Sequence, residues 1–404
     1  MKNKVFLWLM SIILTIALSV TSTLAVVKYA EVKNPKYVIE FNQDEVEFSS
    51  IKVFNEVVDY LKNEYIDEVD MNKAVISATA GVVASVDDPF TMYVPKEYME
   101  SMMEKSEGNY IGIGVVITNP TEGRGTLITT VYPDGPANQS GVLPGDLILK
   151  VDDEDVSGIT DLSYIASIVK GEKGTDVTIN VYRAIEDRYI DFTITRDEVN
   201  SIEVEGRIEE GNIGYIKIIS FSQDSAVEFI NVLKDLISQG MENLVLDLRD
   251  NGGGDYSAIL NIANLFIDGK LITYTIDKNG KKDEQYARSG SLGMPMVVMV
   301  NGYSASASEM LTGALKDYKI ATVIGETTYG KGSVQAVHKL SDGSGLRVTI
   351  AKYYTPNGVC IHGIGIEPDE TILPEDDYIN YPTSLIPRED DVVLDRAIEI
   401  LKGN

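Results

Sequence analysis

Predicted amphipathic helices alternate with short apolar strands between residues 226 and 324, and this alternation constrains the fold more than any other feature of the chain. Apolar residues recur with helical spacing at Ala226, Phe229, Ile230, Leu233, Leu236 and Ile237, and the apolar segment Leu244–Leu248 follows. A second apolar segment, Met296–Val300, precedes a run with helical spacing, SEMLTGAL. Strands and helices that alternate in this way indicate an α/β core.

Two short runs in this part of the chain contain a candidate nucleophile and a candidate base. SASASE (304–309) places Ser306 at a strand-to-helix turn, and GKGSVQ (330–335) supplies Lys331. The unpaired N–H groups and the positive dipole end of a helix start favour an alkoxide or a tetrahedral oxyanion. A lysine removes a serine proton only when it is neutral, so the predicted site must bury Lys331 enough to favour the neutral amine.

Gln335 is a candidate for orienting this amine. It lies four residues beyond Lys331, and that spacing would place both side chains on one face of either a strand or a helix. The same runs also fit a close-packed helix start and a solvated surface lysine, so neither run is specific by itself.

A run of three glycines, 252–254, follows the predicted strand Leu244–Leu248. Consecutive glycines leave backbone N–H groups free to approach a ligand, as an oxyanion hole requires. A phosphate-binding loop is the alternative, but no Gly-Lys-Ser/Thr follows and the chain is strongly acidic.

Composition excludes several classes of function. The 404 residues carry a net charge of −27, which argues against nucleic-acid binding because little would neutralise phosphates. Cys360 is the only cysteine, so neither an intrachain disulfide nor a cysteine-based zinc site is expected, and no metal or cofactor is predicted. The two histidines, His338 and His362, both follow Ser306, and we expect them to be structural rather than part of a Ser-His-Asp triad.

The N-terminus contains an uncharged run of 23 residues, Val5 to Val27, flanked by lysines on both sides. A helix of this length would cross a hydrocarbon core of about 30 Å. A signal anchor is favoured over a cleaved signal peptide, because the apolar run exceeds the usual signal-peptide core. The sequence therefore predicts a single-pass protein of the cell membrane with its chain extracytoplasmic from about Lys28 onward, or a secreted protein if the segment is cleaved.

Helical regions are expected at both ends of the remaining chain. Apolar spacing predicts a helix from Phe48 to Tyr65. Start and stop signals predict two more, from Asn72 to just before Asp88 and from Pro95 to Gly108. These helices form a region that could pair with a second copy of the chain. A further helical stripe between Asp390 and Leu401 is expected to pack against the N-terminal helices of the same or a second chain.

The run YIGIGVVI resembles the carboxylate-binding loop and following strand of a PDZ domain. In that fold, backbone N–H groups hold a peptide's C-terminal carboxylate while the peptide adds a strand to the sheet. An ordinary glycine-rich hairpin is the alternative, but a long match to the rest of the module follows at 135–156, with a predicted helix at 161–169. The expected tail-binding residues are Tyr110, Ile111, Gly112, Ile113, Gly114, Val115 and Lys170.

From Phe48 to its C-terminus the chain resembles the carboxyl-terminal processing peptidases, or tail-specific proteases. The resemblance is carried in order by DPFTMYV, YIGIGV, DLRDNGGG, NGYSASASE, ETTYGKGSVQ and YYTPNGVCIHGIGIEPD. It implies that Ser306 attacks the peptide carbonyl, that Lys331 is the general base and that Gln335 positions the lysine. It also implies oxyanion donors at the backbone N–H groups of Gly253 and Ala307.

Two positions depart from the family pattern. The usual Asn-Pro-Gly-Gly reads Asn251-Gly252-Gly253-Gly254 here, which leaves open whether Gly253 or Gly254 is the donor. Lys170 stands where the family often has arginine, so it supplies the charge without the planar fork.

The predicted fold is an α/β protease core of crotonase-like ββα units with an inserted PDZ domain and helical regions at both ends. The expected regions are the N-terminus with its apolar segment (1–28), an N-terminal helical region (29–108), the PDZ domain (109–197), the protease core (198–374) and a C-terminal helical region (375–404).

The resemblance predicts a membrane-anchored serine endopeptidase that cleaves exported or membrane proteins near their C-termini. Its expected partners are proteins or peptides with free C-terminal tails, the membrane, a second copy of the chain and a regulatory partner that presents or restrains the PDZ domain. One alternative is a catalytically inactive PDZ adaptor that binds protein C-termini. Another relates the core to the enoyl-CoA hydratases acting on thioesters. The joint presence of Ser306, Lys331 and Gln335 disfavours the adaptor, and the PDZ module disfavours the thioester enzyme.

Overall fold

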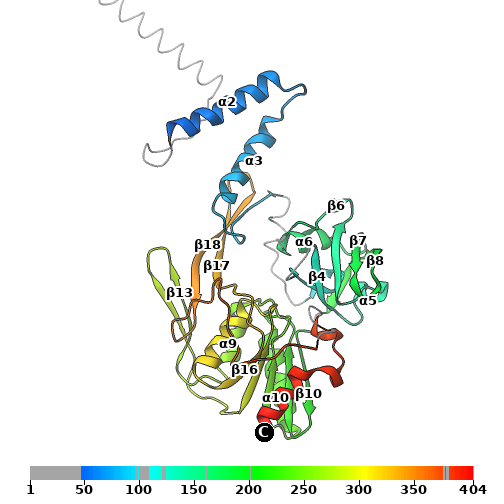
Figure 1. Ribbon diagram of the computed structural model, residues 1–404, viewed down its shortest axis with the longest axis vertical. Helices are drawn as coiled ribbons and strands as arrows, with labels where there is room; N and C mark the ends of the chain where they lie inside the picture. The colour runs from blue at the N-terminus through cyan, green and yellow to red at the C-terminus, as the bar shows by residue number, and fades with distance from the viewer. Residues whose placement is uncertain are drawn as a thin grey trace, which may run out of the picture. The chain divides into compact units, whose positions relative to one another are not determined.

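The computed structural model describes residues 47–96, 99, 109–120, 124–159, 162–200, 202–375, 378 and 382–403 (Figure 1). The chain forms two compact units, Met1–Ser77 and Ala78–Asn404. The predicted membrane segment lies outside the described residues, as does most of the helix predicted to begin at Pro95. Within the described part of the chain, no helix has the length and apolar character needed to cross a bilayer.

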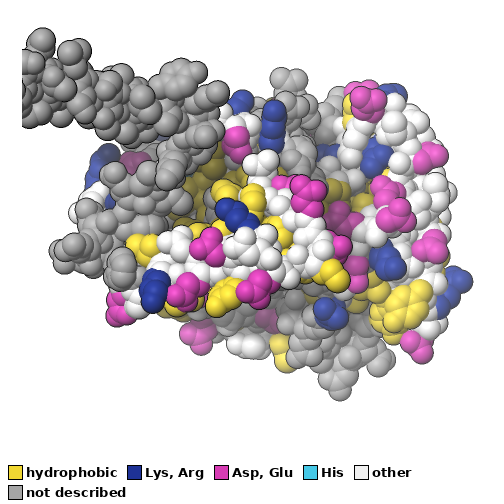
Figure 2. All heavy atoms as spheres, turned by 90° about the horizontal axis from the view of Figure 1, so that it is seen from above, with side chains coloured by type: hydrophobic (Ala, Val, Ile, Leu, Met, Phe, Trp, Pro, Cys, Tyr) yellow, Lys and Arg dark blue, Asp and Glu magenta, His cyan; other side chains and the backbone are white. Residues whose placement is uncertain are grey.

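Two of the predicted N-terminal helices are present. Helix α2 spans Phe48–Glu64 and helix α3 spans Met71–Ala84. The α2 side chains Val53, Phe54, Val57, Tyr60 and Leu61 are exposed although they are large and hydrophobic. Figure 2 shows hydrophobic side chains interspersed with acidic and basic ones on the face that it presents.

The PDZ domain is built on an antiparallel sheet of alternating buried and exposed residues. The strand order is β3 (Val115–Thr118), β4 (Thr126–Val131), β5 (Asp146–Val151), β7 (Asp176–Arg183) and β8 (Arg188–Thr195), and β6 (Glu154–Asp155) pairs with β5. Strand β7 buries every second residue, as a strand with one face on a core must. Helices α5 (Pro136–Ser140) and α6 (Leu162–Val169) contribute Ala137, Ile165 and Val169 to this core.

The strand β2 (Asn109–Gly112) is not part of this sheet. It pairs antiparallel with β9 (Asp197–Asn200) to form a separate two-stranded sheet. Tyr110, Ile111 and Gly112 therefore lie in a strand, and only Ile113 and Gly114 form the connection to β3.

The main sheet of the protease core has the predicted α/β architecture. Its strand order is β10 (Val204–Glu209), β11 (Ile213–Ile218), β12 (Asn243–Asp247), β15 (Met296–Val300), β16 (Ala321–Gly325) and β19 (Glu370–Thr371), and all pairs except β10 with β11 are parallel. Helices α7 (Ser225–Ser238), α8 (Tyr256–Ala263) and α9 (Ala307–Asp317) share one hydrophobic cluster with one face of this sheet. Strands buried on both faces read as continuous apolar runs, which is why MVVMV predicted β15.

The C-terminal helix α10 (Val392–Lys402) covers the opposite face of the main sheet. Its residues Val393, Leu394, Ala397 and Ile398 form a hydrophobic cluster with strand residues that include Val297. The expectation that this helix packs against the N-terminal helices was therefore wrong, because its apolar stripe is used by the core sheet.

A second sheet in the core was only partly predicted. It contains β1 (Met92–Val94), β18 (Gly345–Tyr354), β13 (Leu271–Asp277) and β14 (Lys282–Tyr286), and β17 (Ser333–Lys339) also pairs with β18. Strand β17 confirms the strand expected around His338. The region 29–108 is not wholly helical, because β1 pairs with β18 from Met92 to Val94. Short 3-10 turns occur at Ala184–Glu186, Thr383–Leu385 and Arg388–Asp390.

Candidate active site

Ser306 lies where β15 leads into α9, as the sequence predicted. Its φ of 55° and ψ of −110° are rare for a residue with a side chain and store conformational strain. The turn is held from outside, because the N–H of Ala305 and the hydroxyl of Ser308 both donate to the Asn251 carbonyl, at 3.0 and 2.9 Å. A strained turn of this kind presents a half-buried serine at a helix start, where a nucleophile is needed.

Glu309, three residues into this helix turn, is a fully buried carboxylate. Its Oε2 accepts the backbone N–H of Ser306 at 2.7 Å and that of Lys331 at 2.8 Å. Its Oε1 accepts the Thr328 hydroxyl and the Gly330 N–H, both at 2.6 Å. Burial raises the pKa of Glu309, and these four hydrogen bonds act in the opposite direction by favouring the charged form. The structure thus brings the Ser306 turn and the Lys331 loop together on one carboxylate.

Lys331 lies in the loop between β16 and β17 and is half-buried. Its Nζ lies 5.3 Å from the centroid of the Phe90 ring, so an aromatic side chain covers part of the amine. Glycine is required at the next position, because a Cβ on Gly332 would overlap the backbone nitrogen of His362.

The segment DPFT, which precedes β1, is part of the same neighbourhood. Asp88 accepts the N–H of Phe90 at 3.0 Å and the hydroxyl of Thr91 at 2.7 Å. Burial alone would raise the pKa of Asp88, but hydrogen bonds from Thr349 and Thr91 hold it below its usual range. The Phe90 ring meets the His362 ring edge-on at 6.2 Å between centroids. The sequence assigns Phe90 no role of its own, since nothing local in the sequence relates positions 90 and 331.

Gln335 is not placed as the spacing argument expected. Lys331 precedes β17, which begins at Ser333, so the two residues do not share the face of one strand. The Gln335 amide nitrogen donates to the hydroxyls of Ser333 at 2.8 Å and Thr349 at 3.2 Å.

The glycine loop lies against the Ser306 turn. A Cβ added at Gly253 would lie 2.8 Å from the Ser306 Cβ and 3.0 Å from the Ala307 nitrogen. Ala307 occupies the first position of α9, where an N–H has no intrahelical acceptor. The Gly253 N–H donates to the Asn251 Oδ1 at 2.8 Å, so this amide is engaged within its own loop.

Arg249, in the same loop, forms a buried ion cluster with two carboxylates. Its guanidinium contacts Asp247 at 2.7 Å and Asp391 at 2.8 Å. Burial alone would raise the pKa of Asp247, but the charge of Arg249 lowers it to about 2. The Tyr215 hydroxyl donates to Asp247 at 2.7 Å. Since Asp391 caps α10 through the Leu394 N–H, the cluster links the glycine loop to the C-terminal helix.

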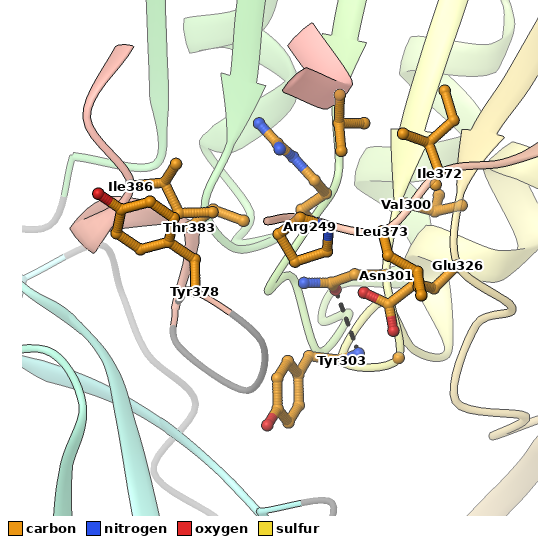
Figure 3. Close-up of a pocket in the computed structure, with 14 residues that line it drawn as sticks. Arg249, Val300, Asn301, Tyr303, Glu326, Ile372, Leu373, Tyr378, Thr383 and Ile386 are labelled. Carbon is orange, nitrogen blue, oxygen red and sulfur yellow. Dashed lines mark hydrogen bonds between the residues drawn. The ribbon is translucent and has the colours of Figure 1, made fainter. Parts of the chain in front are cut away.

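A pocket opens at the carboxyl ends of β15 and β16, and Figure 3 shows the residues that surround it. Asn301, Tyr303 and Glu326 line it from the core, and Leu373 and Tyr378 line it from the C-terminal segment. Burial and the nearby Asp250 raise the pKa of Glu326. Neither Ser306 nor Lys331 lines this pocket.

Of the expected tail-binding residues, Val115 begins the edge strand β3, and Ile113 and Gly114 directly precede it. Among the strands that the structure describes, β3 pairs with β4 alone, so its other edge faces the side on which a peptide would add a strand. Gly114 has a φ of +83°, and a Cβ there would lie 3.3 Å from the Gly135 Cα. Lys170 directly follows α6. Over the described residues, no His, Cys, Asp or Glu side chains gather as ligands of a metal would.

Comparisons with known proteins point to one family. Residues 212–372 match the model of peptidase family S41, and residues 127–183 match that of a PDZ domain. A carboxy-terminal-processing protease of Bartonella bacilliformis is 32% identical over 403 residues, covering 90% of this chain and 91% of the relative. The carboxy-terminal processing protease CtpA of Bacillus subtilis is 35% identical over 337 residues, covering 83% of this chain and 71% of the relative.

A solved structure gives the same result. The photosystem II D1 C-terminal processing protease is 32% identical in sequence and superposes with a TM-score of 0.62. The match covers 80% of this chain and 87% of that one.

Proposed function

Because the chain belongs to peptidase family S41, among the carboxyl-terminal processing serine proteases, we propose that Ser306 is its nucleophile and Lys331 its general base. One observation carries this assignment. The backbone nitrogens of both residues lie within 2.8 Å of the same Glu309 oxygen, and the serine lies in a strained turn at a helix start.

The reaction follows from these positions. Neutral Lys331 takes the proton of the Ser306 hydroxyl as its oxygen attacks the peptide carbonyl. The Ala307 N–H, with an amide of the glycine loop, stabilises the oxyanion of the tetrahedral intermediate. The protonated lysine then donates its proton to the leaving amine, and water attacks the acyl-enzyme by the reverse sequence. Gln335 is proposed to position Lys331, from a side chain whose amide donates to the hydroxyls of Ser333 and Thr349.

Cleavage of a peptide with a free, unstructured C-terminal tail tests the assignment. Ser306→Ala and Lys331→Ala should each lower kcat at least about 10³-fold, because each removes one partner of a proton transfer. His338→Ala together with His362→Ala is the matched control and should retain most activity. A Ser306→Ala enzyme that still cleaves would refute the assignment, and a wild-type protein that binds tails without cleaving them would favour the inactive adaptor.

The PDZ domain is proposed to select substrates by their C-terminal carboxylate and to gate the active site. The exposed edge of β3 and the loop at Ile113 and Gly114 support the binding part of this proposal. An amidated tail should therefore be cleaved more slowly than the free acid. Equal rates for the two peptides would exclude both selection and gating.

The remaining proposals concern the setting of the enzyme. The apolar run from Val5 to Val27 supports a single membrane anchor with the protease on the extracytoplasmic side. The exposed hydrophobic residues of α2 support a homodimer. A regulatory partner could present or restrain the PDZ domain. The mass of the mature chain decides between an anchor and a cleaved signal peptide.

A further inference from the structure

Glu309 makes more hydrogen bonds than a helix cap requires. A capping glutamate three residues into a helix normally reaches back to the N–H of the capped residue, as Glu309 does to Ser306. Its other three bonds go to Thr328, Gly330 and Lys331, which are 19, 21 and 22 positions away in the chain. The side chain therefore joins two segments instead of completing one helix end.

The division of these bonds between the two carboxylate oxygens is informative. Oε1 accepts the Thr328 hydroxyl and the Gly330 N–H, which fixes the loop. Oε2 accepts the N–H of Ser306 and the N–H of Lys331, so one atom sets the distance between the two backbones. One further bond, from the Tyr329 N–H to the Ser304 carbonyl at 3.0 Å, connects the same two segments.

A buried charge at this position lowers the stability of the fold unless hydrogen bonds or an opposite charge compensate for its lost hydration. Glu309 is fully buried, and burial raises its pKa. Ionised, the carboxylate offers acceptors on both sides and can satisfy four donors. Glutamine has the same shape but presents an NH2 group on one side, so at least one backbone N–H donor would face another donor.

We infer that Glu309 is a positioning residue of the peptidase reaction, whose carboxylate holds the serine turn and the lysine loop at the separation that proton transfer needs. The inference rests on the proposed roles of Ser306 and Lys331. The Glu309 carboxylate acts through the backbones of the serine turn and the lysine loop. Its contribution is geometric, since small displacements of reacting groups reduce rates strongly.

The test compares Glu309→Gln with a buried control on the same helix. Thr312→Val is matched, because Thr312 is fully buried and its hydroxyl has no hydrogen-bond partner among the described residues. Glu309→Gln should lower kcat about 100-fold with KM unchanged, while its unfolding transition stays cooperative and the protein is fully folded at the assay temperature. Thr312→Val should keep wild-type kcat and KM.

A second pair of variants separates positioning from general destabilisation. Thr328→Val removes one donor to Glu309 and also the acceptor of the Ile366 N–H, whereas Thr328→Ser keeps both. Thr328→Val should lower kcat and Thr328→Ser should not. In the Glu309→Gln background, Thr328→Val should cause a smaller further loss than in the wild type, because part of its effect acts through the carboxylate.

Two results would overturn the inference. One is a Glu309→Gln enzyme with kcat within twofold of wild type, and the other is an activity loss that only follows the unfolded fraction. Should Glu309→Gln fail to fold, the Thr328 pair decides, and equal kcat for Thr328→Val and Thr328→Ser would reject the inference.

Ser306→Ala and Lys331→Ala in the same assay distinguish failure of this inference from failure of the proposed function. If both are inactive while Glu309→Gln is active, only the role of Glu309 fails, whereas activity in Ser306→Ala removes the assignment on which it rests.

Discussion

Gly253 lies closer to the serine turn than a side chain would allow. A Cβ at this position would lie 2.8 Å from both the Ala305 carbonyl oxygen and the Ser306 Cβ, and the residue has a φ of +101°. Both facts select glycine, because a Cβ would clash and the backbone conformation disfavours L-residues. The glycine thus allows the loop and the nucleophile to be packed against each other.

Gly253→Ala should therefore impair both catalysis and folding. We expect kcat to fall about 10²-fold, because the turn must shift, and the free energy of unfolding to fall by about 1–3 kcal/mol. Gly252→Ala is the control, since a Cβ there meets nothing within 4 Å. Kinetics and thermal unfolding of both variants test this, and equal kcat values for them would contradict the proposed packing.

At the scale of elements, α10 is bound to the core by an ion cluster as well as by its apolar stripe. Asp391 accepts two hydrogen bonds from Arg249, each at 2.8 Å, and also caps the helix. Because Arg249 belongs to the glycine loop, the C-terminal helix and the loop are stabilised together. Loss of the Asp391 charge leaves Arg249 paired with Asp247 and removes the ionic link to α10.

Asp391→Asn is expected to cost about 1.5–3 kcal/mol of unfolding free energy, because asparagine can still cap α10 but weakens the two charge-assisted hydrogen bonds from Arg249. Asp395→Asn is the matched control on the same helix. Its ion pair with Arg388 is exposed, so its loss should cost at most about 1 kcal/mol. Denaturant unfolding measures the loss of unfolding free energy in both variants. Similar losses would show that the buried cluster stabilises the fold no more than an exposed ion pair does.

The periodicity of apolar residues was sufficient to predict the elements whose buried face follows from their own sequence. The spacing of apolar residues predicted α2 and α7, start and stop signals predicted α3, and the apolar run MVVMV predicted β15. The PDZ domain and the S41 core followed from ordered motifs and are confirmed by the family matches. The sequence also showed the apolar stripe of α10. Such a stripe does not identify the surface against which it packs, which is the main sheet in this structure.

The site was less predictable because its contacts join distant segments. Ser306 was correctly placed at the strand-to-helix turn, whereas Lys331 lies in a loop and not on a face shared with Gln335. The Ser-x-x-Glu spacing at 306–309 is a helix-capping signature. It indicates neither that Glu309 is buried nor that its carboxylate accepts hydrogen bonds from Gly330 and Lys331. These contacts depend on how the loop at 328–331 packs against the start of α9, and no local sequence pattern encodes that packing.

At the scale of the whole molecule, the proposed active site is assembled from five segments that are far apart in the sequence. Residues 88–91 cover the lysine, 249–254 form the glycine loop, 304–309 contain the serine, 328–335 contain the lysine, and 391 supports the loop from the C-terminal helix. The acidic chain needs no cofactor for the proposed reaction, since the nucleophile, base and oxyanion donors are all its own residues.

The central claim is that Lys331 activates Ser306, and covalent labelling tests it most directly. The protein is incubated with a fluorophosphonate, and the adduct is located and its rate of formation followed by mass spectrometry. We expect a single adduct on Ser306 in the wild type, and a Lys331→Ala variant that folds but forms it at least about 10²-fold more slowly. An adduct on another residue, or labelling of Lys331→Ala at the wild-type rate, would show that Lys331 does not activate Ser306.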